Sequence, residues 1–274
     1  MQFFKIFTTY IIMNILCIHF GVSNRILAFI NHINKNKKYN IKSYNVFNKS
    51  DFKNLKNSGF KMYDGIILLG IGNQNTYYSD KYVPRTKCSI KCLKKDHKEV
   101  LNYLITLIEL NSNTPILGVC YGAMILNYYY GGSEIIKPDA GIQGFLKTTI
   151  DKQSPLFKNI EGEFYPQYNH NYVMIHDNSK VIAFNESSQL RSGYQFSKNH
   201  YGISFHLINS DSKCEKIIDN FFDIVEKRKP ISVLIMLLLL LMAIFLLKIV
   251  YKVNYPKNFV AVILICICIN SLFV

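Results

Sequence analysis

The segment from Pro115 to Gly132, PILGVCYGAMILNYYYGG, constrains the fold of this chain more than any other. Its first residues form a short apolar run that is typical of a buried strand, and the residues after Cys120 favour a helix. Gly118 and Gly122 stand two residues before and after the cysteine, where a sharp strand-to-helix turn needs small residues for close packing. The pattern predicts a turn that presents the Cys120 thiol at a helix N-terminus.

A cysteine at such a position has the properties of a nucleophile. The partial positive charge of the helix N-terminus favours thiolate over thiol, and the backbone N–H groups there can bind a developing oxyanion. The alternative is a buried structural cysteine between two turn glycines. His206 ends the alternating segment YGISFH and is a candidate base for Cys120, because an α/β sheet can bring both residues to one edge.

Short apolar runs alternate with longer amphipathic segments, which predicts an α/β fold with a doubly wound, mostly parallel sheet flanked by helices. The expected strands are Ile15–Phe20, Ile41–Phe47, Gly65–Leu69, Pro115–Val119 and Tyr201–Phe205, and the expected helices are Asn24–Asn34, Lys95–Leu110 and about 212–226. The loops after the first, third and fourth strands are expected to meet at the edge where such sheets bind ligands.

Together these motifs resemble the class I glutamine amidotransferases, whose pattern is G-x-C-x-G-x-Q, then a paired glycine, then G-x-x-F-H-P-E. The resemblance covers about residues 13–226. It rests on six segments that occur in the family's order: MNILCIHFG, DGIILLGIG, GVCYGAM with the following Gly131-Gly132, YNHNYVM, VIAFNES and YGISFH. The resemblance implies a flavodoxin-like amidotransferase fold with a cysteine–histidine–glutamate site.

The resemblance also implies a role for each matching residue. Cys120 would attack the γ-carboxamide of glutamine while His206 shuttles the proton, and water would then release glutamate from the thioester. Five further residues would bind the oxyanion or the substrate: Gly70, Ile71, Tyr121, Met124 and His170. For His170, an exposed turn histidine is the alternative. The resemblance implies no metal and no cofactor.

The chain departs from the family pattern at three positions of the site. Ile208 stands where the family has the triad glutamate, whose carboxylate fixes the imidazole tautomer and stabilises imidazolium. Asn209 or Asp211 could replace it only after a loop shift. Met124 stands in place of the glutamine that contacts the substrate amide, and Ile71 in place of the second oxyanion glycine.

Three functions therefore compete. The first is an enzyme that hydrolyses the amide of glutamine or of a γ-glutamyl compound and delivers ammonia to a synthase in trans, since the chain has no synthase domain of its own. The second is a non-catalytic, amidotransferase-like interaction module that has lost the triad glutamate. The third is a cysteine hydrolase of another small amide, which would differ in the pocket around Met124 and Ile71.

The net charge of +14 does not predict binding to nucleic acid, because 28 of the 32 basic residues are scattered lysines. The four arginines do not form a cluster with interleaved aromatic residues: they are Arg25, Arg85, Arg191 and Arg228.

The seven cysteines lack Cys-x-x-Cys spacing and imply no disulfide framework. Cys88 and Cys92 with His97 lack a fourth metal ligand and are better explained as the start of a helix.

The two ends of the chain are apolar. Residues 227–274 are expected to form a basic linker and one or two transmembrane segments, 231–250 and 258–274, that would anchor a cytosolic domain to a membrane. Residues 1–12 are expected to be an extension of the domain at 13–226. The alternative is that the first twenty residues act as a signal peptide, although residues from Met13 onward match the first strand of the family.

Overall fold

The computed structural model describes residues 12–35, 38–60, 63–71, 90–136, 141–207 and 212–228. The chain divides into two compact units, Met1–Val225 and Glu226–Val274. Of the second unit, only residues 226–228 are described.

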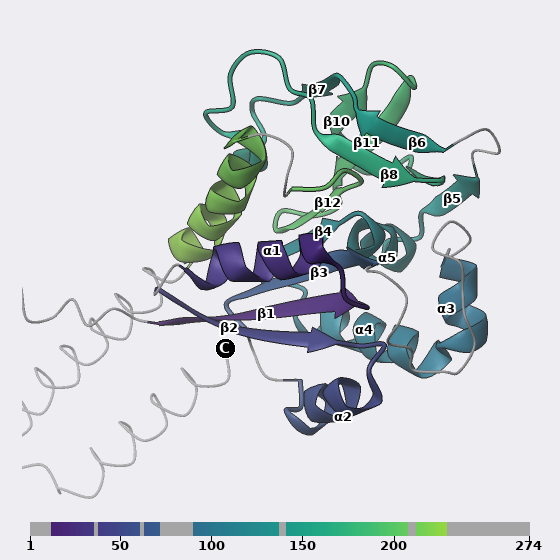
Figure 1. The fold of residues 1–274 in the computed structure, drawn as a ribbon, viewed down its shortest axis with the longest axis vertical. Coiled ribbons are helices and arrows are strands. Elements are labelled where there is room, and N and C mark those ends of the chain that lie inside the picture. The colour runs from purple at the N-terminus through teal and green to yellow at the C-terminus, as the bar shows by residue number, and fades with distance from the viewer. Residues whose placement is uncertain are drawn as a thin grey trace, which may run out of the picture. The chain divides into compact units, whose positions relative to one another are not determined.

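An eight-stranded sheet runs through the first unit in the order β2-β1-β3-β4-β12-β11-β10-β7 (Figure 1). The five parallel strands are β1 (Met13–Phe20), β2 (Tyr39–Asn45), β3 (Gly65–Ile71), β4 (Ile116–Val119) and β12 (His200–Ile203). The antiparallel strands are β11 (Leu190–Gln195), β10 (Lys180–Asn185) and β7 (Thr148–Ile150). The parallel part has the strand order of flavodoxin-like folds, so the predicted doubly wound, mostly parallel sheet is confirmed.

Two small sheets complete the strand-rich region that follows Gly132. One pairs β5 (Ser133–Ile136) with β9 (Tyr172–Ile175), and the other pairs β6 (Ile142–Phe145) with β8 (Gln167–His170). A short 3-10 helix lies at Pro155–Phe157.

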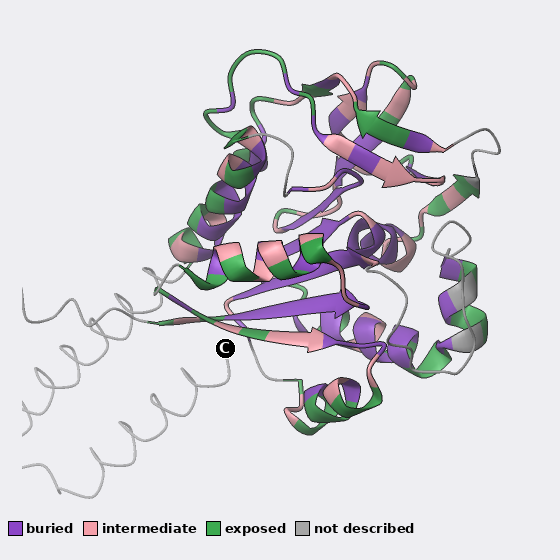
Figure 2. Ribbon diagram, viewed as in Figure 1, coloured by how far each residue is buried: buried purple, intermediate pink, exposed green. Residues whose placement is uncertain are grey.

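The central strands are buried on both faces, and for this reason they appear in the sequence as continuous apolar runs (Figure 2). Alternate residues of each strand enter different cores. In β1, Ile15 and Cys17 belong to one core cluster, whereas Leu16 and Ile18 belong to the other. The sheet therefore separates two hydrophobic layers, each of which must be covered by helices.

Helices from different parts of the chain cover each layer. The first core contains residues of α1 (Asn24–Asn34) and of a final helix at 212–228. The second contains residues of α2 (Lys49–Asn57), α3 (Ile90–Asp96), α4 (Lys98–Leu110) and α5 (Tyr121–Tyr129). The structure confirms the predicted helix Asn24–Asn34, whose N-terminus is capped by the Ser23 hydroxyl.

The predicted helix Lys95–Leu110 is wrong at its start. Helix α3 ends at Asp96 and α4 begins at Lys98. Between them, His97 leaves helical geometry with φ −138° and ψ 41°, and its buried ring stacks on Phe47 with 4.6 Å between ring centroids. The break therefore comes from a tertiary contact, which helical periodicity cannot reveal.

The predicted strand Ile41–Phe47 ends two residues early, at Asn45. The Asn45 side-chain oxygen accepts hydrogen bonds from the backbone N–H groups of Phe47, at 3.1 Å, and of Gly21, at 2.8 Å. An asparagine that binds its own backbone two residues on turns the chain, and helix α2, which the sequence analysis did not predict, begins soon after at Lys49.

The membrane-anchored localisation expected from the sequence is overturned. Nowhere in the described ranges does a helix combine the length and the apolar character needed to cross a bilayer. The last described helix, 212–228, buries Ile217 and Phe221 in the first core and leaves charged residues exposed. The apolar runs 231–250 and 258–274, from which the anchor was inferred, lie outside the described residues, as do residues 1–11.

His200, the first residue of β12, links three elements. Its Nδ1 accepts a hydrogen bond from the Tyr130 hydroxyl at 2.7 Å, and its Nε2 donates to the Thr114 carbonyl at 3.1 Å. This pattern requires a neutral ring. Because the ring is fully buried, desolvation lowers the pKa of His200 to about 4.

We expect the free energy of unfolding to fall as the pH drops from about 6.5 toward 4. In this range the unfolded chain binds a proton at His200, whereas the folded chain does not. His200→Phe is expected to reduce this dependence, even though it lowers stability at neutral pH; the remainder comes from His170, whose pKa burial also lowers to about 4. Urea denaturation at several pH values measures both effects, with His32→Phe on α1 as the control. Equal pH slopes in wild type and His200→Phe would contradict the assignment.

Candidate active site

Cys120 occupies a strained turn between β4 and α5. Its φ is 55° and its ψ −110°, a conformation that residues other than glycine rarely adopt. Such strain costs about 1 to 3 kcal/mol and persists only where the surrounding structure enforces it. Here the Cys120 N–H donates to the Ile203 carbonyl at 2.7 Å, and the Cys120 carbonyl accepts from Ala123 and Met124 in α5.

The two flanking glycines allow this turn to pack against the sheet. A methyl group on Gly122 would overlap the carbonyl oxygen of Leu68 in β3. A methyl group on Gly118 would lie 2.7 Å from the Gly122 carbonyl oxygen. The strand–turn–helix arrangement predicted from the sequence is therefore observed, and both small residues are required by close backbone contacts.

His206 reaches the same edge of the sheet because β12 lies beside β4. The two strands are parallel, with Ile203 opposite Val119, so the chain leaves both at the same level. The His206 N–H then donates to the Gln167 carbonyl at 2.9 Å, which ties this residue to the start of β8. His206 and Cys120, which are distant in sequence, thus lie at the same edge of the sheet.

Gly70, in β3, lies close to both the nucleophile and the base. A methyl group built on Gly70 would lie 3.4 Å from the Cys120 sulfur and 3.9 Å from His206 Cε1. The three predicted residues Cys120, His206 and Gly70 are therefore brought together. A cysteine nucleophile needs a base nearby, and His206 is placed for that role.

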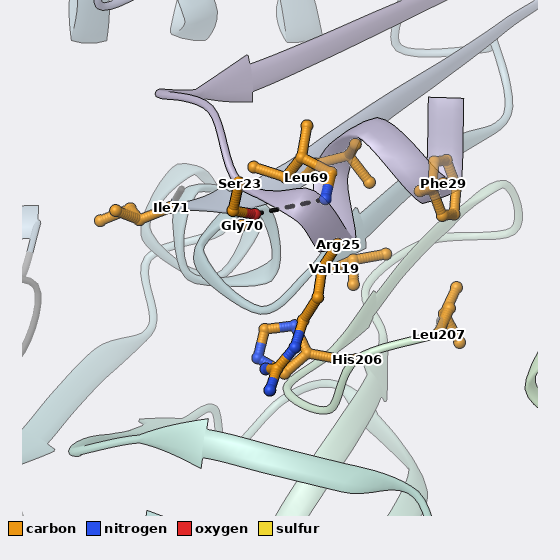
Figure 3. A pocket seen from close by; sticks show the side chains of 10 residues that line it. Ser23, Arg25, Phe29, Leu69, Gly70, Ile71, Val119, His206 and Leu207 are labelled. Atoms are coloured by element: carbon orange, nitrogen blue, oxygen red, sulfur yellow. Dashed lines mark hydrogen bonds between the residues drawn. The ribbon is translucent and has the colours of Figure 1, made fainter. Parts of the chain in front are cut away.

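A pocket opens beside this group (Figure 3). Gly70, Ile71 and His206 line it, together with Val119, which precedes the nucleophile. Arg25, from the first turn of α1, also lines the cavity, and sequence reasoning missed it. The signal that could have found Arg25 is its place just after β1, at the carboxyl edge where parallel sheets bind ligands.

The structure places two of the predicted substrate-binding residues away from this cavity. Met124 lines a different pocket, with Lys94 and Asn127. His170, in β8, lines a third pocket, with Tyr168 and neither Cys120 nor His206.

His170 is partly buried, so it is not the exposed turn histidine considered as the alternative. Its Nδ1 lies 2.7 Å from the Tyr172 carbonyl oxygen, and desolvation lowers the pKa of His170 to about 4.

The ring of Tyr121 packs in the second core rather than lining the pocket beside His206. The ring is buried edge-on against Phe20, with 5.1 Å between centroids. The Tyr121 N–H belongs to the first turn of α5.

The remaining positions discussed from the sequence lie outside the described residues. These are Ile208, Asn209, Asp211, Cys88 and the side chain of Cys92. Within the part of the chain that the structure describes, no group of three histidine, cysteine or acidic side chains could hold a metal ion.

The family model of the class-I glutamine amidotransferases matches residues 31–224, more than two thirds of the 274 residues. The chain belongs to this family. The chain is 31% identical over 101 residues to a subunit of the glutamine-hydrolyzing GMP synthase of Methanocaldococcus jannaschii, a match that covers 36% of this chain and 53% of that protein. It is 29% identical over 131 residues to the glutamine-hydrolyzing GMP synthase of Mesoplasma florum, covering 46% of this chain and 25% of that protein.

The chain thus spans about half the length of the first of these relatives, and a quarter of the second. Two crystal structures share the fold of the amidotransferase. A putative GMP synthase subunit from Thermoplasma acidophilum has a TM-score of 0.59 at 19% identity, covering 80% of this chain and 97% of that one. A glutamine amidotransferase from Thermotoga maritima has a TM-score of 0.54 at 16% identity, covering 80% and 86%.

Gly122→Ala is expected to destabilise the protein by about 3 kcal/mol or more, because the added methyl group meets backbone that cannot move aside cheaply. Gly131→Ala is the matched control: it has open space but a φ of 83°, and is expected to cost about 1 to 2 kcal/mol. Denaturant unfolding measures both. Equal costs would mean that α5 does not pack on β3 as described.

Gly70→Ala is expected to leave the free energy of unfolding within about 1 kcal/mol of wild type, since its contacts are tight but not overlapping. The same methyl group fills the space in front of the Cys120 sulfur, so alkylation of Cys120 by iodoacetamide is expected to slow at least about tenfold, or about 1.4 kcal/mol in activation free energy. Peptide mass spectrometry follows the modification, with Cys120→Ser defining the background. An unchanged rate would show that substrates approach the sulfur from another side.

Proposed function

We propose that this chain hydrolyses the side-chain amide of glutamine, or of a γ-glutamyl compound, through a thioester on Cys120. The observation that carries the proposal is the meeting of Cys120 and His206 around Gly70, at the end of parallel strands. Membership of the class-I glutamine amidotransferases supports the substrate class. We further propose residues 13–226 as the catalytic domain.

The reaction begins with proton transfer from the Cys120 thiol to the His206 imidazole. The thiolate attacks the amide carbon, and the resulting oxyanion is bound by backbone N–H groups at Ile71 and Tyr121. Collapse of this intermediate breaks the carbon–nitrogen bond, and His206 gives its proton to the leaving ammonia. Water then attacks the thioester, which releases the carboxylic acid and regenerates the thiol.

The turn at Cys120 prepares the first step. The strained backbone holds the sulfur at the N-terminus of α5, where the helix dipole favours the thiolate. A side chain at position 70 would crowd both the sulfur and the imidazole, and glycine avoids this. We propose that the ammonia passes to a synthase on a separate chain, as the M. jannaschii relative is named as one subunit of GMP synthase.

One observation favours a second candidate, the non-catalytic interaction module. Ile208 occupies the position of the triad glutamate, and loss of the carboxylate behind a catalytic histidine lowers rates by orders of magnitude in comparable triads. A module without activity would keep the glycines of the turn, because the packing of α5 on β3 requires them.

Labelling with 6-diazo-5-oxo-L-norleucine, an electrophile shaped like glutamine, distinguishes these candidates. We expect one adduct per chain, its loss in Cys120→Ala and a rate at least about tenfold lower in His206→Ala, as expected for loss of a general base. Intact-mass spectrometry of the full chain measures each rate.

Cys17→Ala is the matched control, since this thiol is buried in β1 and desolvation raises its pKa to about 12. Its labelling is expected to equal that of wild type. If wild type reacts no faster with this reagent than an ordinary exposed thiol does, the enzymatic proposal fails and the interaction module remains.

A further inference from the structure

Arg25 is held at the carboxyl edge of the sheet by local structure. It belongs to the first turn of α1, where the Ser23 hydroxyl accepts a hydrogen bond from the Ile26 N–H at 3.3 Å (Figure 3). Strand β1, which leads into this turn, is paired with β3 so that Phe20 lies opposite Ile71. The start of α1 is therefore fixed relative to the strand that carries Gly70 and Ile71.

The Arg25 side chain extends from α1 toward the imidazole of His206, and both residues line the same cavity (Figure 3). Much of the remaining lining is apolar, including Phe29, Leu69 and Leu207. Among the described residues that line this pocket, Arg25 is the one with a permanent charge. No aspartate or glutamate is among these lining residues.

A guanidinium in such a place selects for anions. It stays protonated at any working pH, and its planar set of donors matches the two oxygens of a carboxylate. In a cavity with apolar walls this attraction is less screened than it would be in water. Glutamine and γ-glutamyl compounds carry a carboxylate a few bonds from the amide that would reach Cys120.

We propose that Arg25 binds the substrate carboxylate and makes the enzyme selective for amides that carry one. The inference rests on the proposed function, because it places the amide at Cys120. It adds a specificity-determining residue that comes from α1, outside the segments that contain the nucleophile and the base.

Two alkylating reagents test this without requiring hydrolysis. Iodoacetate and iodoacetamide react with a thiolate by the same displacement of iodide, but only iodoacetate carries a carboxylate. The measured quantity is the ratio of their rates at Cys120 in the full chain, followed by peptide mass spectrometry. Both rates are measured on the same variant. A change in the fraction of Cys120 present as thiolate therefore alters both rates equally and cancels in their ratio.

We expect Arg25→Met to lower the iodoacetate-to-iodoacetamide ratio at least about tenfold, and Arg25→Lys to give an intermediate ratio, since lysine keeps the charge but not the planar donors. Arg228→Met, the same change at an exposed helical position, is expected to leave the ratio unchanged. In wild type the ratio is expected to fall as salt is added, because salt screens the attraction between Arg25 and iodoacetate. This measurement does not depend on the folding of any variant.

An Arg25→Met ratio equal to that of wild type, or a wild-type ratio insensitive to salt, would overturn the role of Arg25. Neither result would bear on hydrolysis, which is tested by the glutamine-shaped reagent at Cys120 and His206. Conversely, a chain that fails to react with that reagent but keeps the charge-dependent ratio would lose the proposed activity and keep the anion-binding site.

Discussion

The parallel pairing of β12 with β4 is the contact on which the rest of the site depends. It places Ile203 opposite Val119, and the Ile203 carbonyl accepts the hydrogen bond that holds Cys120 in its strained conformation. The same pairing delivers His206 to the level of the sulfur. One strand contact therefore supports the nucleophile and supplies the base, so that any shift in its register would separate the two.

Close packing of α5 on β3 adds the second constraint. Because Gly122 rests directly on the Leu68 carbonyl, the helix approaches the sheet closely and starts immediately behind the sulfur. Its first turn offers N–H groups, and the adjoining end of β3 offers Gly70 and Ile71. The strain at Cys120 is thus enforced from two sides, by a strand neighbour and by a buried helix, as stored strain at a functional site requires.

The predictions that succeeded share a physical property. The turn at Cys120, the helix Asn24–Asn34 and the parallel strands follow from patterns of neighbouring residues, which act over a few positions of the chain. The error in the helix has the opposite origin, because stacking of His97 on the distant Phe47 breaks a helix that its periodicity makes continuous. The error at the strand end has a local cause: the Asn45 side chain accepts a hydrogen bond from the Phe47 N–H, two residues on.

The sequence by itself determined the local elements of this protein: a buried strand, a glycine-flanked turn with a cysteine, a helix, and a later strand followed by histidine. Only the tertiary structure decided which side chains share a cavity, since that depends on strand order and register across residues far apart in the chain. It brought Arg25 and His206 to one pocket and placed Met124 and His170 in others. Local sequence patterns do not reveal which distant side chains come together, because that depends on how whole strands are paired.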